Sequence, residues 1–196
     1  MSIQALAALA RRLNREAGAP PIPALYFFTD PERIPDPIAI ARTLPPETAV
    51  VYRHFGAPER SQTARKLAAA CAARRLVLLI AADPDLALCV GAAGVHWPEH
   101  TLPALRDARF RLVTASAHSR AAVARVERFG ADACILGPVF GTRSASNNAP
   151  LGVFRASQLA RASTIPVIAL GGVALRNARK LSGRGFAGVA AVDAFL

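Results

Sequence analysis

"GADACILG", residues 130–137, joins the end of one helical pattern to the start of an apolar run. Its glycine is suited to end a helix, and a short turn separates that glycine from the apolar residues. The same order returns in "GAAGVHW" (91–97) and "GFAGVAAV" (185–192). Repetition of a helix end followed by a buried strand is typical of proteins that alternate helices with parallel strands. The stretch therefore predicts an α/β fold.

Eight apolar runs lie along the chain, and most lack the polar alternation of a strand with one face in water. They span residues 24–28, 50–53, 76–80, 94–97, 111–115, 133–137, 166–170 and 188–192. Such runs indicate parallel strands that are covered on both faces. Helical patterns separate many of them, as in residues 61–74, 119–129 and 152–161. This alternation predicts a single compact (β/α)₈ barrel domain over residues 1–196, with the barrel itself in residues 24–196.

An open, doubly wound sheet is the alternative fold. Such a sheet normally carries a glycine-rich phosphate loop after its first strand, whereas this chain has "FFTDPERIP" (27–35) there. The barrel is therefore preferred. Because the sequence ends just after the eighth run, we expect an amphipathic helix over residues 1–18 to stand in for the eighth helix. That helix would cover the seam between strands eight and one.

Composition argues against several classes of protein. No apolar run reaches the ~18 residues needed to cross a bilayer, and no basic residues precede the first apolar segment as they do in a signal peptide. We therefore expect a cytoplasmic protein that does not bind membranes. Cys71, Cys89 and Cys134 lie among apolar residues without the spacing of metal ligands, which predicts buried thiols.

The net charge is +11, and nearly all of it comes from arginine. Such a charge favours anionic partners. Nucleic-acid binding usually needs clustered basic residues with exposed aromatic side chains, whereas these arginines are scattered and only 6% of residues are aromatic. A phosphorylated small molecule is therefore the expected partner, nucleic acid is not, and a homo-oligomer stays open.

In a (β/α)₈ barrel, ligands bind to the loops at the carboxyl ends of the strands. After the seventh apolar run comes "GGVALRNA" (171–178), where Gly171 and Gly172 precede the start of a helix. Backbone N–H groups at such a turn can approach an anion closely, and a helix N-terminus favours negative charge. The turn therefore predicts a phosphate site, to which we also assign Val192 at the end of the neighbouring eighth run.

Further polar side chains are expected on the same rim, namely Arg53, His96, Ser116 and His118. Three histidines at strand ends, His54, His96 and His118, would be enough for a metal site. However, His54 directly follows Arg53, so strand alternation turns one of these two away from the barrel mouth. No metal site is therefore expected.

Five motifs resemble, in order and spacing, those of thiamine phosphate synthase and its TenI relatives. They are "AAGVHWPE" (92–99), "VTASAH" (113–118), "GADACILGPVFGTRS" (130–144), "IPVIALGGV" (165–173) and "GFAGVAAV" (185–192). The resemblance runs from about Arg53 to Phe195. It implies a TIM barrel that binds phosphorylated thiazole or thiamine-type ligands. In this family the synthase joins a thiazole phosphate to a pyrimidine pyrophosphate with Mg²⁺, and TenI isomerises a thiazole carboxylate phosphate.

The resemblance also implies roles for matching residues. Arg53 resembles the arginine that faces the pyrimidine and the pyrophosphate, and Ser116 resembles a serine near that pyrophosphate. Thr142 and Ser144 resemble the two hydroxyl residues of a loop that folds over the substrate. The Gly-Gly pair matches the glycines at the thiazole phosphate.

This chain departs from both known active sites. The synthase's two metal-binding segments correspond to Ala81 and Ala82 and to a position near Thr101. Its loop lysine corresponds to Ala145, and the catalytic histidine of TenI corresponds to Pro138. Asp83 and Glu99 lie close to the two metal positions in the sequence. Asp193 stands where the family has a small hydroxyl residue, and its carboxylate would repel a phosphate unless it points away or is protonated.

Three functions follow as alternatives. The preferred one is a TenI-like protein that binds a phosphorylated thiazole or thiamine-type ligand without a cofactor. In it, His118 beside Ser116 acts as general acid–base, and Arg53 orients an anionic group. The second is a Mg²⁺-dependent synthase with Glu99 and Asp83 as displaced metal ligands. The third is a barrel without catalysis that binds a metabolite or a partner protein.

Overall fold

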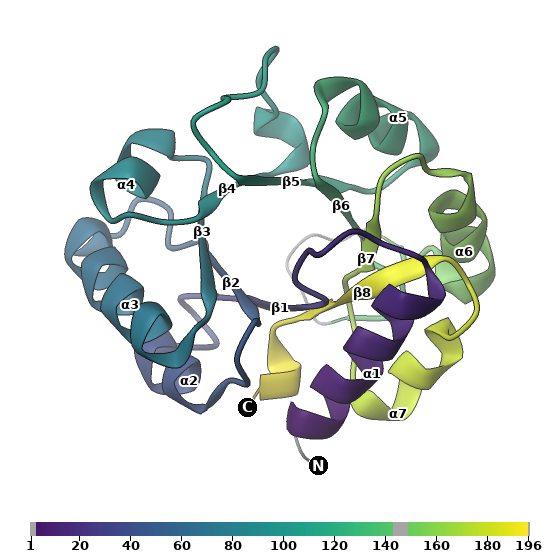
Figure 1. Ribbon diagram of the computed structural model, residues 1–196, viewed down its shortest axis with the longest axis horizontal. Helices are drawn as coiled ribbons and strands as arrows, with labels where there is room; N and C mark the ends of the chain where they lie inside the picture. Colours follow the sequence, from purple (N-terminus) through teal and green to yellow (C-terminus); the bar gives the residue numbers. More distant parts are fainter. Residues whose placement is uncertain (1–2, 143–148, 196) are drawn as a thin grey trace.

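The computed structural model describes residues 3–142 and 149–195, which form a closed barrel of parallel strands (Figure 1). The strands follow one another around the ring in sequence order, and β8 closes it by pairing with β1. They are β1 (Leu25–Phe28), β2 (Ala49–Tyr52), β3 (Val77–Ala81), β4 (Gly94–Trp97), β5 (Leu112–Ala117), β6 (Ala133–Leu136), β7 (Val167–Ala169) and β8 (Phe186–Ala191). The predicted (β/α)₈ barrel is confirmed.

Helices surround the ring (Figure 1). They are α1 (Ile3–Glu16), α2 (Pro37–Thr43), α3 (Arg60–Arg74), α4 (Pro84–Cys89), α5 (Arg120–Phe129), α6 (Gly152–Ala162) and α7 (Leu175–Ala178), with the 3₁₀ helices η1 (Glu99–Thr101), η2 (Arg179–Leu181) and η3 (Asp193–Phe195). The connection from β4 to β5 contains η1 in place of an α-helix. Helix α5 has the predicted ends, because Ser119 accepts the N–H of Ala122 and Gly130 closes the helix with a φ of 78°.

Helix α1 packs over the seam where β8 meets β1 (Figure 1). Its buried side chains are Leu6, Ala7, Leu9, Ala10 and Leu13. Asn14 Nδ2 donates to the carbonyl of Ala187 in β8 at 3.2 Å, and the Glu16 carboxylate accepts the N–H of Gly183 at 2.8 Å. The N-terminal helix therefore stands in for an eighth helix, as predicted.

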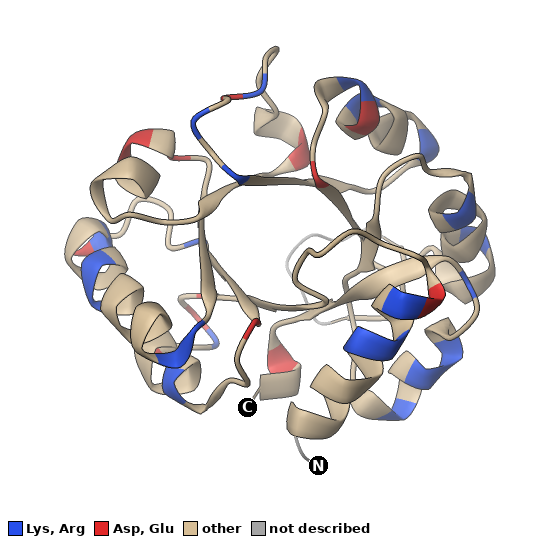
Figure 2. Ribbon diagram, viewed as in Figure 1, with Lys and Arg blue, Asp and Glu red and all other residues tan. Residues whose placement is uncertain are grey.

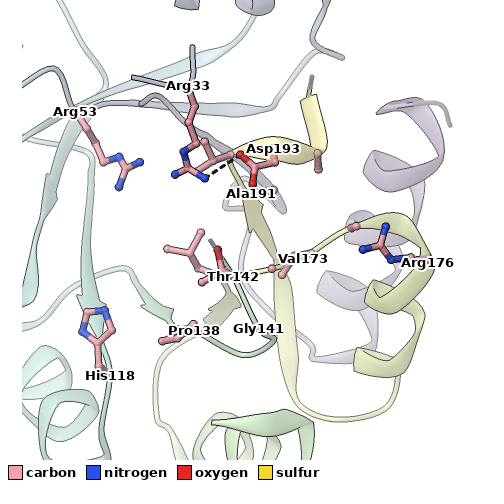
Figure 3. Close-up of a pocket in the computed structure, with 17 residues that line it drawn as sticks. Arg33, Arg53, His118, Pro138, Gly141, Thr142, Val173, Arg176, Ala191 and Asp193 are labelled. Carbon is pink, nitrogen blue, oxygen red and sulfur yellow. Dashed lines mark hydrogen bonds and ion pairs between the residues drawn. The ribbon is translucent and has the colours of Figure 1, made fainter. Parts of the chain in front are cut away.

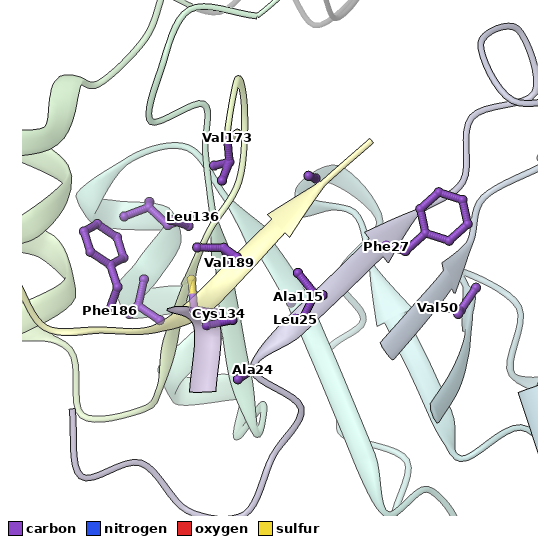
Figure 4. Packing of buried hydrophobic residues seen from close by; sticks show 14 of the residues in the cluster. Ala24, Leu25, Phe27, Val50, Ala115, Cys134, Leu136, Val173, Phe186 and Val189 are labelled. Carbon is purple, nitrogen blue, oxygen red and sulfur yellow. The ribbon is translucent and has the colours of Figure 1, made fainter. Parts of the chain in front are cut away.

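Two apolar regions stabilise the barrel, one inside the ring and one between the ring and the helices. The inner region contains alternate strand residues, among them Tyr26, Phe28 and Ile135. The outer region contains the intervening strand residues, such as Phe27 and Val189 (Figure 4), and apolar residues of the surrounding helices. Both faces of each strand are thus buried, which explains why the strand sequences lack polar alternation.

The three cysteines do not share one environment. Cys71 and Cys134 are buried, as predicted, but the prediction is wrong for Cys89, which is exposed. Cys89 is the last residue of α4, and its sulfur lies 3.8 Å from a guanidinium nitrogen of Arg65 on α3. Apolar sequence neighbours did not reveal this, because successive residues of a helix point in different directions.

The basic residues lie mainly on the outer helices, including α1, α3, α5, α6 and α7 (Figure 2). They are distributed over several of these helices, as the scattered arginines of the sequence suggested. Within residues 3–142 and 149–195, no helix combines the length and the apolar composition needed to cross a membrane.

Candidate functional site

The loops at the carboxyl ends of the strands enclose a cavity of about 620 Å³ (Figure 3). This volume lies in the range of small-molecule sites, roughly 300–1,000 Å³. Of the site residues predicted from the sequence, those in the cavity wall are Arg53, His118, Thr142, Gly171, Gly172 and Val192. Ser116 is absent from this wall, and Ser144 lies outside the described residues.

The turn after β7 brings backbone donors to the cavity. Gly171 and Gly172 have left-handed φ values of 92° and 60°, which residues with a side chain rarely adopt. Asn177 holds the turn, because its Nδ2 donates to the carbonyl of Gly172 at 2.7 Å and its Oδ1 accepts the N–H of Ala174 at 2.9 Å. The N–H groups of Gly171, Gly172 and Val173 donate to no acceptor in the part of the chain that the structure describes. These three donors are available to an anion.

The loop after β6 touches this turn. The N–H of Phe140 donates to the carbonyl of Gly171 at 3.0 Å. A Cβ atom at Gly172 would overlap the carbonyl oxygen of Gly141, so only glycine lets the two loops meet there. Thr142, the next residue of the loop, lies in the cavity wall. The close approach of the loops thus places a hydroxyl beside the glycine turn.

Arg53 enters the cavity from the position just beyond β2, rather than from within that strand as predicted. Its N–H donates to Thr29 Oγ1 at 2.9 Å, and its Nε donates to the Thr29 carbonyl at 2.8 Å. Its guanidinium lies 5.4 Å from the centre of the Phe28 ring. Burial lowers the pKa of Arg53, although Asp30 favours the charged form. The guanidinium stays protonated at neutral pH, because arginine titrates far above pH 7.

Arg33, which the sequence analysis missed, also lines the cavity. Its Nη2 donates to Asp30 Oδ2 at 2.7 Å, and its Nη1 donates to Asp193 Oδ1 at 2.8 Å (Figure 3). Burial disfavours the charged form of Arg33, but these hydrogen bonds outweigh burial and raise its pKa. A third arginine, Arg176 on α7, also lines the cavity. A signal for Arg33 was present in the sequence, since it closely follows the first strand and therefore belongs to the rim.

His118 directly follows β5 and is oriented by Glu99 of η1. Its Nδ1 lies 2.7 Å from Glu99 Oε2, and its backbone N–H donates to the same oxygen at 2.9 Å. A carboxylate can only accept, so Nδ1 carries the proton and Nε2 is the free basic atom of the neutral ring. Arg125 holds Glu99 in turn, with Nη2 donating to the Glu99 carbonyl at 2.6 Å. The ring of His118 is thus positioned at the cavity wall.

His96 lies inside the barrel and is not exposed to the cavity. Its Nδ1 is 2.9 Å from Thr114 Oγ1 and its Nε2 is 3.0 Å from Ser116 Oγ. Burial, together with the charge of Arg53, lowers the pKa of His96 to about 3. Ser116, expected after the fifth strand, lies within β5 and is engaged with His96. His54, the remaining strand-end histidine, packs against the Tyr52 ring at a centroid distance of 4.8 Å.

Asp83 and Glu99, the carboxylates of the synthase alternative, are both engaged with other groups. Asp83 Oδ1 accepts the N–H of Leu86 at 3.0 Å, and its Oδ2 lies 3.8 Å from Arg60. Glu99 binds His118 and Arg125 as described. Mg²⁺ is usually held through one or two carboxylates, together with waters and substrate phosphates, and those carboxylates must be free to face the ion. Because Asp83 and Glu99 are directed to other groups, these two carboxylates as they are placed do not fit Mg²⁺. In the described segments no three His, Cys, Asp or Glu side chains are grouped closely enough to hold a metal ion.

Comparison with known proteins relates the chain to one family. Residues 25–195 match a family model described as thiamine monophosphate synthase. A putative thiamine-phosphate synthase 2 of Aquifex aeolicus is 34% identical over 125 residues, which cover 62% of this chain and 67% of that protein. A thiamine-phosphate synthase of Chlorobium limicola is 29% identical over 182 residues, which cover 89% of this chain and 87% of that protein.

Other relatives match over a smaller part of their length. The match covers 58% of a putative thiamine-phosphate synthase of Geobacter sulfurreducens and 40% of a thiamine-phosphate synthase of Synechococcus. Among solved structures, a thiamine phosphate pyrophosphorylase from Pyrococcus furiosus aligns with a TM-score of 0.72 at 25% identity. That alignment covers 94% of this chain and 87% of the solved one.

Proposed function

Because this chain belongs to the thiamine monophosphate synthase family, we propose that its cavity binds a phosphorylated thiazole or thiamine-type ligand. The ligand's phosphate binds at the turn after β7, and its organic part extends across the barrel mouth toward His118. Phosphate sites of (β/α)₈ barrels commonly lie at the loops after strands seven and eight, which agrees with this placement.

One observation carries the proposal. Gly171, Gly172 and Val173 line the cavity, and their N–H groups have no acceptor in the described part of the chain. Arg33 and Arg53 line the same cavity. Backbone donors beside guanidinium groups stabilise a phosphate far better than a neutral ligand, because hydrogen bonds to an ionised acceptor are stronger than neutral ones.

His118 acts as the general acid–base of this site. Glu99 keeps the proton on Nδ1, so Nε2 accepts a proton from the ligand and returns it to another ligand atom. Atoms and charge balance in such a transfer, whose net result is isomerisation. A thiazole carboxylate phosphate is the substrate class for this chemistry, with Arg53 orienting the carboxylate. The chemistry needs no metal, and Asp83 and Glu99 are engaged with Arg60, the N–H of Leu86 and His118.

The proposal is tested by comparing thiamine phosphate with thiamine in calorimetric titrations. Ala174, which lines the cavity just before α7, is the residue to be substituted. Asp and Asn cap a helix about equally well, so Ala174→Asp and Ala174→Asn differ mainly in charge. We expect wild type to prefer thiamine phosphate, and we expect the Asp variant to bind it about tenfold or more weakly than the Asn variant.

Equal affinities of the wild-type protein for thiamine and thiamine phosphate would show that no phosphate binds at this turn. Equal affinities of the Asp and Asn variants for thiamine phosphate would show the same. A second assay measures conversion of thiazole carboxylate phosphate by the wild-type protein. Turnover supports the isomerase chemistry, whereas tight binding without turnover identifies a barrel that binds its ligand without converting it.

A further inference from the structure

Arg33 lies between two carboxylates that are held very differently. Asp30 accepts Nη2 of Arg33 at 2.7 Å and also accepts the backbone N–H groups of Glu32 and Arg33, at 3.2 and 3.1 Å. Asp193 accepts Nη1 at 2.8 Å and has no other partner in the described part of the chain. Its side chain is 53% exposed, compared with 19% for Asp30. Asp30 is therefore fixed in its loop, whereas Asp193 is held by Arg33 alone.

The Arg33–Asp193 pair stands in the wall of the candidate phosphate site. Val192 and Asp193 directly follow β8, and both line the cavity together with the glycine turn. Figure 3 shows Asp193 beside Arg33 in this wall. A phosphate at that turn would bring a second anion into the same cavity. Two anions in a partly buried site repel one another unless a cation lies between them. Arg33 supplies such a cation to Asp193.

We propose that Arg33 is a phosphate-binding residue and that Asp193 is an internal counter-ion which the ligand's phosphate displaces. This inference rests on the proposed function. It adds that Arg33 is the cation which binds the phosphate and that Asp193 competes with the phosphate for Arg33. Hydrogen bonds from a guanidinium group to phosphate oxygens are charge-assisted and strong, so Nη1 exchanges a carboxylate for a more highly charged partner. Asp30 keeps Nη2 throughout, and the half-exposed Asp193 carboxylate moves into water.

The exchange makes the cavity selective. A ligand must compete with Asp193 for Arg33. Its apparent affinity is therefore lowered in proportion to the small fraction of protein in which the Arg33–Asp193 pair is open. A dianionic phosphate monoester gains more from Arg33 than a carboxylate or a phosphodiester with one negative charge does. The device therefore favours phosphate monoesters over other organic anions.

Calorimetric titration with two probes, inorganic phosphate and thiamine phosphate, tests the exchange. Asp193→Asn removes the competitor, and we expect it to bind both probes about tenfold more tightly than wild type. Arg33→Gln removes the cation, and we expect binding about tenfold or more weaker. In the double variant, the gain from Asp193→Asn should disappear, because no cation remains to be released.

A matched control separates this effect from a change in net charge. Glu32→Gln alters the charge by the same amount within the same loop as Arg33, and Glu32 does not line the cavity. Its affinity for both probes should equal that of wild type. A gain as large as that of Asp193→Asn would show that net charge alone is responsible, and would overturn the inference.

The remaining outcomes distinguish the inference from the proposed function. Binding of the probes that is unchanged or weaker in Asp193→Asn overturns the exchange alone. If only thiamine phosphate binds more weakly, Asp193 contacts the cationic ring of that ligand instead of competing with its phosphate. Absence of binding of either probe, in wild type and in Asp193→Asn alike, overturns the exchange and the proposed function together.

Discussion

Two histidines, His96 within β4 and His118 just after β5, differ in what surrounds their rings. His96 is enclosed by the barrel, and both of its nitrogens are engaged with the hydroxyls of Thr114 and Ser116. His118 has one nitrogen on Glu99 and lies in the cavity wall. Proton exchange with a ligand requires a ring nitrogen within reach of it, so His118 is suited to catalysis and His96 to structure.

His118→Ala should lower the turnover of thiazole carboxylate phosphate by roughly 10²–10⁴-fold with little loss of ligand affinity. The reason is that the substitution removes the proton carrier and leaves the phosphate site intact. Glu99→Gln still offers Nδ1 an acceptor, so we expect a smaller loss of about tenfold. Steady-state kinetics together with calorimetry measure both effects. Wild-type turnover by the alanine variant would leave His118 a purely structural residue.

His96 should make the stability of the protein depend on pH. Its pKa is about 3 in the folded state, whereas an unfolded histidine titrates near ~6.5. Between these values the unfolded chain binds the extra proton, so the free energy of unfolding falls as the pH drops from ~6.5 toward ~3, by at most about 1.4 kcal/mol per pH unit. His96→Leu should have a flatter dependence, measured by urea unfolding at about pH 6.5 and 4.5. Equal pH dependence in both proteins would contradict a neutral, buried His96.

At the scale of elements, α1 completes a barrel whose other helices each follow a strand. It precedes β1 in the sequence but packs mainly on β8, beside α7 (Figure 1). The contact is apolar at Leu13, which is fully buried, and polar at Asn14, which donates to a carbonyl of β8. Without α1, the outer face of β8 would be exposed to water.

Leu13→Ala should therefore lower the free energy of unfolding by about 2–5 kcal/mol, because it leaves a cavity between α1 and the ring. Arg11→Ala, at an exposed position of the same helix, should change it by no more than about 0.5 kcal/mol. Urea unfolding measures both variants. Deletion of residues 1–18 should leave insoluble protein, and a soluble deletion variant that unfolds cooperatively would show that α1 is dispensable.

At the scale of the whole molecule, closure of the ring assembles the site from distant parts of the chain. Arg33 and Asp193 are 160 positions apart in sequence and meet at 2.8 Å because β1 pairs with β8. The same closure places Arg53 and the glycine turn around one cavity. The resulting mouth is rich in guanidinium groups, and its acidic residues are already paired with cations or N–H groups.

We therefore expect no detectable thiamine phosphate from a thiazole phosphate and a pyrimidine pyrophosphate, with or without Mg²⁺. Pyrophosphate departure needs strong stabilisation of negative charge, and loss of one stabilising group typically costs ~10²–10³-fold in rate. In this chain, Ala81 and Ala82 stand where the resemblance to the synthase places a metal-binding segment. Asp83 accepts the N–H of Leu86 and lies near Arg60. A discontinuous assay of product formation is the measurement. Robust Mg²⁺-dependent synthesis would show that Asp83 and Glu99 rearrange to hold the metal.

The amino-acid sequence by itself determined the barrel and the place of the glycine turn. Both depend on local features: Ser119 and Gly130 delimit a helix, apolar runs without alternation mark covered strands, and Gly171 with Gly172 permits a left-handed turn. Such features act over a few residues and recur with each βα unit. They could therefore be recognised without knowledge of any long-range contact.

The tertiary structure alone decided which charged and polar groups meet. The sequence did not show that Arg33 meets Asp193, which lies near the other end of the chain, or that Glu99 holds His118. Nor could the sequence show that Ser116 is engaged with His96 inside the ring. The physical reason is that a side-chain pair between loops leaves no periodic pattern, since its geometry is set only when the strands close into a ring.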